Sequence, residues 1–138
     1  MSLPRAVILV VEGHPIVRAC MAETLVEACF EALAVGDATH AIAMLEARPD
    51  IRLVFTETEI PGTIDGLNLA RCIRDRWPPL KLIVVSGRAE AADGYLPAGA
   101  KFFEKPYRDT AIVAEMVGML FPGVAAAVRK PARRFRSW

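Results

Sequence analysis

Short apolar runs alternate with longer segments of mixed polarity from residue 5 onward. Three of the runs, at residues 6–11, 53–55 and 82–85, are continuously apolar, as expected of parallel strands that helices cover on both faces. Two weaker runs lie at residues 31–35 and 101–103. Strands that alternate with helical segments are typical of βαβ units. The pattern therefore predicts an α/β domain built on a parallel sheet of five strands.

Helical periodicity fills the segments between these runs. Proline is tolerated in the first turn of a helix, so His14 and Pro15 mark the start of the first one. Asp65 has a side chain suited to an N-cap, and Pro78 ends the helix that follows it. We expect helices at residues 14–28, 37–47, 65–77, 89–95 and 109–120. The apolar spacing predicts these inner faces: Ile16, Val17, Cys20, Leu25 and Ala28 in the first, Leu67, Ala70, Ile73 and Trp77 in the third, and Ile112, Val113, Met116 and Leu120 in the last.

Composition narrows the class of protein. The 138 residues suit one domain, which we place at residues 1–120, and no apolar run reaches the roughly 18 residues of a membrane span. The chain opens without a charged leader and an apolar signal segment, which favours the cytoplasm over secretion. The three cysteines are odd in number and outside any CxxC pattern. We therefore expect reduced, buried or half-buried thiols rather than a disulfide framework or a zinc site.

Positive charge is concentrated at the end of the chain. Five of the 17 basic residues follow position 128, so the rest of the chain has 12 basic and 16 acidic residues, a net charge of −4. Phe135 and Trp138 lie among these arginines, and aromatic rings can stack on bases. However, the body is acidic, and the 18 residues after the last helix are too few for a helix-turn-helix unit. We expect residues 121–138 to be a basic extension that is solvated or contacts a partner, and no nucleic acid as ligand.

Polar residues follow the expected strands, where a doubly wound sheet binds its ligands. Four short motifs lie at these strand ends, in this order along the chain: Val10-Val11-Glu12 with Pro15, Pro61-Gly62 with Asp65-Gly66-Leu67, Val85-Ser86-Gly87, and Phe103-Glu104-Lys105-Pro106. Together they resemble the receiver domain of bacterial response regulators over about residues 5–120. The resemblance implies a flavodoxin-like doubly wound (βα)5 three-layer sandwich with sheet order 2-1-3-4-5. It also implies two-component phosphorelay signalling with a protein partner, such as a histidine kinase or a downstream regulator.

The resemblance carries over to individual residues. In the family, acidic residues after the first strand and an aspartate after the third hold Mg²⁺, and this aspartate accepts a phosphoryl group. Glu12 matches the first acid, Ser86 the hydroxyl that contacts the phosphoryl group, and Lys105 the lysine that does so. Pro106 matches a cis proline. Phe102 matches the family's aromatic switch position, and we expect Tyr95, Leu96 and Phe102 on the face that binds the partner.

Two positions depart from the family pattern. Gly13 stands where the second acid belongs, and it brings no oxygen to a cation that requires near-octahedral coordination. Glu57 stands at the phosphoacceptor position, where the extra methylene moves its carboxylate, and an error of about 1 Å can cost around 100-fold in rate. Glu12, Glu57 and Glu59 remain as candidate ligands of a weak or lost Mg²⁺ site. We expect no cofactor and no catalytic residue.

Several interpretations of the altered site stay open. Glu57 imitates the phosphorylated state by reaching Lys105 and Ser86, or the pocket has decayed and Glu57 is tolerated at a solvent-facing strand end. Ser86 can also simply cap the turn after its strand, and the lysine can serve as a structural ion-pair partner. His14 beside Glu12 suggests a further alternative, a carboxylate and imidazole cluster for Zn²⁺ or Mn²⁺.

The sequence favours a phosphorylation-independent receiver-like module, a pseudo-receiver that acts by protein contact and not as an enzyme. One alternative is a functional phosphoacceptor that a histidine kinase phosphorylates. Another is a flavodoxin-like domain that binds a small ligand or a metal, although Glu12-Gly13-His14-Pro15 is not a glycine-rich phosphate loop. A monomer and a homodimer are both compatible with the sequence.

Overall fold

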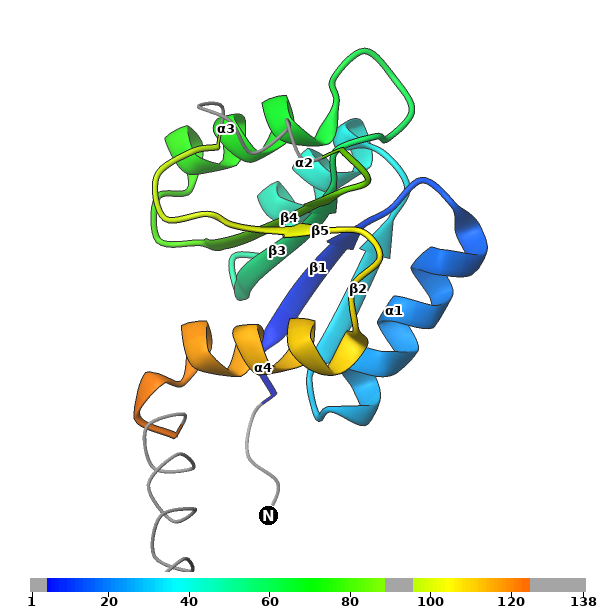
Figure 1. Cartoon of the computed structure of the whole chain (residues 1–138). Helices are drawn as coiled ribbons and strands as arrows, with labels where there is room; N and C mark the ends of the chain where they lie inside the picture. The colour runs from blue at the N-terminus through cyan, green and yellow to red at the C-terminus, as the bar shows by residue number, and fades with distance from the viewer. Residues whose placement is uncertain (1–4, 89–95, 125–138) are drawn as a thin grey trace, which may run out of the picture.

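The computed structural model of the chain describes residues 5–88 and 96–124 (Figure 1). Five parallel strands form one sheet in the order β2-β1-β3-β4-β5. The strands are β1 (Val7–Val11), β2 (Glu31–Val35), β3 (Ile51–Glu57), β4 (Lys81–Ser86) and β5 (Lys101–Glu104). The predicted parallel sheet and its strand order are confirmed.

Four helices of the described residues cover the two faces of the sheet (Figure 1). They are α1 (Pro15–Glu27), α2 (Ala38–Ala47), α3 (Gly66–Arg76) and α4 (Asp109–Leu120). Side chains cap three of them: His14 Nδ1 accepts from Ile16 N, Asp37 Oδ1 from His40 N and Asp65 Oδ1 from Asn68 N, of which the Asp65 cap was predicted. The helix expected at residues 89–95 lies outside the described residues, as does most of the basic extension.

The core consists of two apolar layers, one on each face of the sheet. Alternate residues of a strand point to opposite faces, so Leu9 and Val54 pack with α2 and α3 while Ile8 and Phe55 pack with α1 and α4. All of β1 is buried, as its continuously apolar sequence predicts. The chain is therefore a three-layer α/β/α sandwich. Among the described residues, no helix is long and apolar enough to span a membrane.

The inner face predicted for α1 is partly wrong. Ile16 is 70% exposed, Val17 and Cys20 are exposed too, and the residues that α1 buries are Met21 and Leu25. The helix has apolar residues on most of its surface, so apolar spacing alone does not select the face that packs.

The expectation of buried thiols is also wrong for two of the three cysteines. Cys20 and Cys29 are exposed and Cys72 is half-buried. Cys29 follows the end of α1 with a positive φ of 71°, and this turn keeps it at the surface. In α3, Ala70 and Ile73 are buried as predicted, together with Leu69, which the predicted stripe omitted.

Candidate functional site

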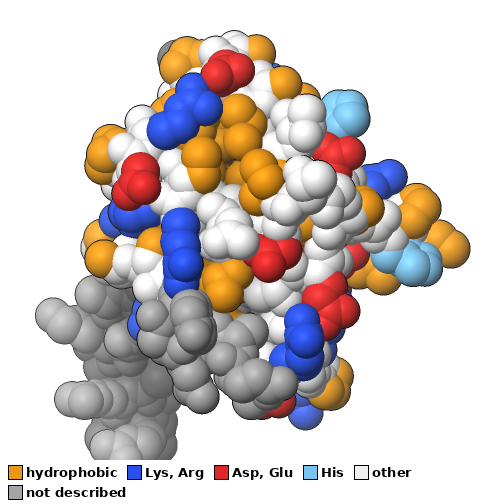
Figure 2. Space-filling model, turned by 90° about the horizontal axis from the view of Figure 1, so that it is seen from above, with side chains coloured by type: hydrophobic (Ala, Val, Ile, Leu, Met, Phe, Trp, Pro, Cys, Tyr) orange, Lys and Arg blue, Asp and Glu red, His pale blue; other side chains and the backbone are white. Residues whose placement is uncertain are grey.

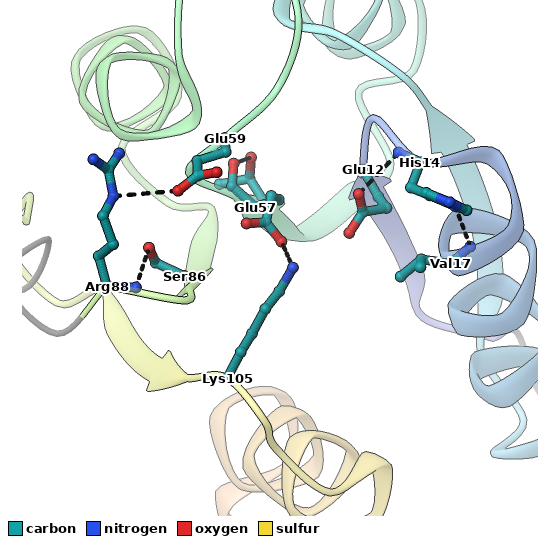
Figure 3. Close-up of polar contacts among 9 residues, drawn as sticks. Glu12, His14, Val17, Glu57, Glu59, Ser86, Arg88 and Lys105 are labelled. Atoms are coloured by element: carbon teal, nitrogen blue, oxygen red, sulfur yellow. Dashed lines mark hydrogen bonds and ion pairs between the residues drawn. The ribbon is translucent and has the colours of Figure 1, made fainter.

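The carboxyl ends of the parallel strands bring four predicted side chains to one edge of the sheet. Glu12 follows β1, Glu57 ends β3, Ser86 ends β4 and Lys105 follows β5 (Figure 3). Backbone hydrogen bonds continue the sheet into this edge, because Thr58 N donates to Val85 O at 2.9 Å and Lys105 N donates to Ser86 O at 2.8 Å. The edge is therefore held by the same ladder that forms the sheet.

Glu57 is the best-buried carboxylate of this edge. Its relative exposure is 4%, and its Oε2 forms an ion pair with Lys105 Nζ (Figure 3). Burial raises the pKa of Glu57 above its ordinary value; Lys105 opposes this rise and the negative charge of Glu12 adds to it. The interpretation of Glu57 as a residue tolerated at a solvent-facing strand end is therefore wrong, because the residue is covered and paired.

Glu12 is buried beside it but is held by the turn into α1. Its Oε2 accepts a hydrogen bond from His14 N at 3.0 Å, and its backbone oxygen accepts from Arg18 Nη1 at 2.9 Å. The imidazole of His14 caps α1 through Nδ1 and lies on the far side of Glu12 from Glu57 (Figure 3). The predicted carboxylate and imidazole cluster for Zn²⁺ or Mn²⁺ does not form, because the cap orients the ring toward the helix.

Gly13 lies in a position where a side chain has no room. A Cβ built on Gly13 would meet Pro61 Cδ at 2.8 Å, closer than real Cβ contacts. An acidic side chain at this position would therefore require Pro61 to shift.

Ser86 and Glu59 are engaged with Arg88 on the other side of Glu57. Ser86 is fully buried, and its Oγ accepts a hydrogen bond from Arg88 N at 3.1 Å, which is the turn cap considered above. Arg88 Nε lies 3.2 Å from Glu59 Oε1 in an exposed ion pair (Figure 3). The structure describes both Ser86 and Glu57 and shows no hydrogen bond between them. Of the two partners predicted for Glu57, Lys105 is therefore the one that it contacts.

Residues 8–117 match the family of the response regulator receiver domain. The chain belongs to this family. A putative NtrX-like response regulator of Rickettsia felis is 27% identical over 110 residues, which cover 77% of this chain and 23% of that protein. The hydrogenase transcriptional regulatory protein HoxA of Cupriavidus necator is 31% identical over 93 residues, covering 67% of this chain and 19% of that protein. This receiver domain thus spans less than a quarter of the length of these two relatives.

Solved receiver structures have the same fold. A response regulator receiver protein from Sinorhizobium medicae superposes with a TM-score of 0.76 at 27% identity, over 86% of this chain and 97% of that one. NtrX from Brucella abortus superposes with a TM-score of 0.76 at 28% identity, over 94% of this chain and 30% of that one. The chain is therefore a receiver domain of the kind found in two-component response regulators.

The candidate ligands of this receiver domain do not fit Mg²⁺. Within residues 5–88 and 96–124, no group of three or more His, Cys, Asp or Glu side chains lies close enough to hold a metal ion. Mg²⁺ takes oxygen ligands in near-octahedral geometry, but Gly13 offers no side-chain oxygen, Lys105 holds Glu57 and Arg88 holds Glu59. The ammonium of Lys105 is thus the cation that contacts the buried carboxylate.

Two residues near the site were not predicted from the sequence. Arg88 directly follows the Val85-Ser86-Gly87 motif, and this position is the signal from which its place near the site could have been predicted. Tyr107 directly follows Lys105-Pro106, whose peptide bond is cis as the resemblance implies. The ring of Tyr107 packs edge-on against the ring of Phe55, with 6.1 Å between the ring centres. Burial, with smaller effects from Asp109, Glu12 and Glu57, raises the pKa of Tyr107 to about 12. Its hydroxyl therefore stays protonated at neutral pH.

The predicted partner face is described only in part. Leu96 and Phe102 are half-buried and pack against the core layer that includes Leu9 and Val54. Tyr95 lies outside the described residues. The inward packing of Phe102 is the usual behaviour of a phenylalanine, which has no hydroxyl that would need a partner at the surface.

Proposed function

We propose that this receiver domain signals by protein contact and independently of phosphorylation. The observation that carries the proposal is the position of Glu57, a buried carboxylate that stands where the family has its phosphoacceptor and pairs directly with Lys105. In this proposal Lys105 is permanently engaged, whereas in a phosphorylated receiver the corresponding lysine binds the phosphoryl group.

The same pair disfavours phosphoryl transfer. An attacking carboxylate oxygen must approach phosphorus in line with the leaving group. In this proposal the longer side chain of Glu57 and its ion pair with Lys105 keep the Glu57 carboxylate oxygens away from that position. Gly13 has no side chain that could help bind a cation, and Pro61 occupies the space next to it. We propose that Mg²⁺ binds weakly at best and that the domain is not an enzyme.

Glu57 is, however, an incomplete substitute for a phosphorylated aspartate. A carboxylate carries one negative charge, whereas a phosphoryl group carries about −1.5 to −2 and has three acceptor oxygens. Lys105 can be held by one oxygen of Glu57, while Ser86 is left to cap the turn at Arg88. The proposal is therefore a fixed signalling state in which the lysine is engaged and the serine is not.

Exposed apolar side chains beside the site support action through contact. Ile16 and Val17 project from the start of α1, and Ile64, which precedes α3, is 38% exposed. Figure 2, a view from above, shows apolar side chains next to charged ones on this side of the molecule. We propose a protein partner here, a histidine kinase or a downstream regulator, in the cytoplasm.

Backbone amide spectra of the ¹⁵N-labelled chain test the proposal. Adding acetyl phosphate and Mg²⁺ should leave the amides of β5 and of residues 105–107 unchanged, because Glu57 accepts no phosphoryl group. The matched control is Glu57→Gln, which keeps the shape of the side chain and removes the ion pair with Lys105. It should shift these amides and so show that they report on the site. A shift of the same amides in the natural chain with acetyl phosphate would instead support the rival function, a working phosphoacceptor.

A further inference from the structure

The amino end of the sheet, opposite the candidate site, contains two open hollows. One has a volume of about 350 Å³ and lies between Arg5, Ala28 and Phe121. The other has a volume of about 370 Å³ and lies between Arg52, Lys81 and Leu120. Both are lined by residues at the C-terminal end of α4, Phe121 in the first and Leu120 in the second. Each is of the size that proteins use to bind small ligands or bulky side chains.

Phe121 stands between the two hollows. The guanidinium of Arg52 lies 5.4 Å from the centre of its ring, and Arg52 Nη2 donates to Leu120 O at 3.3 Å. Phe121 is nevertheless 37% exposed, and Val124 beyond it is 54% exposed. The two hollows and this aromatic ridge form one surface, which we call the amino-end surface.

The charged side chains that line the two hollows are all basic, and the acidic residues that adjoin them in sequence, Glu31 and Asp50, are paired with Arg48. The charged residues that line the hollows are Arg5, Arg52 and Lys81, and neither hollow is lined by an acidic residue. Among the described residues, Arg5 and Lys81 have no acidic partner. Arg48 contrasts with them, because Asp50 and Glu31 neutralise it. The lining thus combines one mainly apolar hollow, beside Phe121, and one hollow of mixed polarity with cations that have no acidic partner among the described residues.

We propose that the amino-end surface binds an acidic peptide segment of a partner protein that carries bulky apolar side chains. The apolar side chains enter the hollows beside Phe121, and the carboxylates lie against Arg5, Arg52 and Lys81. Recesses of this shape favour a peptide over a lipid bilayer, which is bound by apolar side chains that project from the protein. The proposal goes beyond the function proposed above and does not depend on Glu57.

Fluorescence anisotropy of the full chain tests it. The probe is a short fluorescein-labelled peptide that alternates Asp and Glu with Leu and Phe, and the control peptide has Lys in place of the acids. One exposed ion pair contributes up to about 1 kcal/mol, which corresponds to about fivefold in affinity. The double variant Arg52→Gln, Lys81→Gln removes two such pairs and should therefore bind the acidic peptide up to about 25-fold more weakly. The matched variant Arg108→Gln, at the other end of α4, should bind like the natural chain.

Two controls keep the result specific. The five basic residues after position 128 attract any acidic peptide, but they are the same in every variant, so the difference between variants measures the amino-end surface. A second double variant, Arg5→Gln, Lys81→Gln, removes two cations without disturbing the contacts of Arg52 with Leu120 and Phe121. Thermal melting of each variant checks that it is folded.

Three outcomes would overturn the proposal. The first is equal affinity of the natural chain and both double variants for the acidic peptide. The second is binding of phosphatidylglycerol vesicles that the variants lose, without peptide binding, which would assign the surface to a membrane. The third is self-association in sedimentation that the variants abolish, again without peptide binding, which would assign it to a second copy of this chain.

Discussion

The two edges of the sheet differ in how many of their basic residues have an acidic partner. At the carboxyl edge, Glu57 is buried and paired with Lys105, and Arg88 is paired with Glu59. At the amino edge, Arg48 is paired with Asp50 and Glu31, whereas Arg5 and Lys81 line open hollows and, among the described residues, have no acidic partner. A charge that is already paired within the domain is less available to a ligand than an unpaired one. The charged side chains of the family's site are thus paired within this chain, and the unpaired cations of the amino edge are the ones on which we base the proposed peptide site.

At the carboxyl edge α3 packs closely against the end of β3, and Gly66→Ala should show the largest effect. A Cβ on Gly66 would lie 1.7 Å from the backbone oxygen of Glu57, so β3 and α3 would have to separate. We expect a loss of about 3 kcal/mol or more in the free energy of unfolding, measured with urea. Gly118→Ala is the control, because nothing lies within 4 Å of its Cβ, and it should gain about 0.5–1 kcal/mol in a helix interior. Similar effects of the two substitutions would contradict this packing.

The sheet and most helix boundaries could be predicted because apolar runs and caps are local signals. β1 is buried along its whole length, and α4 spans residues 109–120 as its spacing predicts. The packed face of α1 could not be predicted, since apolar residues surround that helix and its contacts with the sheet select Met21 over Ile16.

The site was predicted through its motifs, but its contacts were predicted only in part. The strand ends bring Glu57 to Lys105 because parallel strands share one carboxyl edge. Two other features depend on how the loop after β3 folds over the edge. These are the burial of Glu57 and the close approach of Pro61 to Gly13. The pairing of Arg88 with Glu59 likewise joins two loops, and spacing along the chain does not reveal such contacts.

A lysine-to-methionine substitution at each edge should have a different effect on stability, because Lys105 is paired and Lys81 is not. Lys105→Met leaves the buried carboxylate of Glu57 without its cation, and we expect a loss of about 1–3 kcal/mol in the free energy of unfolding at neutral pH. Lys81→Met removes an unpaired surface charge and should change stability by less than about 0.5 kcal/mol. Urea unfolding of both variants measures the difference, and equal losses would mean that the Glu57 pair has no special role in stability.

Glu57→Gln should reveal the cost of burying the carboxylate through its dependence on pH. Because burial raises the pKa of Glu57, its contribution to stability is fully present below the ordinary pKa and is lost as the pH rises through the higher pKa of the folded state. The glutamine does not titrate. Its stability relative to the natural chain should therefore increase with pH over this range, as thermal melting in a pH series would show. A relative stability that decreases with pH would mean that Lys105 outweighs burial.

The smallest effect is expected at the exposed start of α1. Ile16→Ser should change the free energy of unfolding by less than about 0.5 kcal/mol, since the side chain is 70% exposed. Met21→Ala, one turn further on the buried face, should cost about 2–5 kcal/mol. A large loss for Ile16→Ser in urea unfolding would show that this residue packs against the domain and is not free for a partner.

Intact-protein mass after incubation with acetyl phosphate and Mg²⁺ shows whether Glu57 accepts a phosphoryl group. The natural chain should keep its mass, because Glu57 forms no acyl phosphate. Two variants serve as controls: Glu57→Asp, which leaves Gly13 and Pro61 undisturbed, and the double variant Glu57→Asp, Gly13→Asp, for which Pro61 must shift. Gain of one phosphoryl group by either variant but not by the natural chain is the predicted result. A gain by the natural chain would contradict the account.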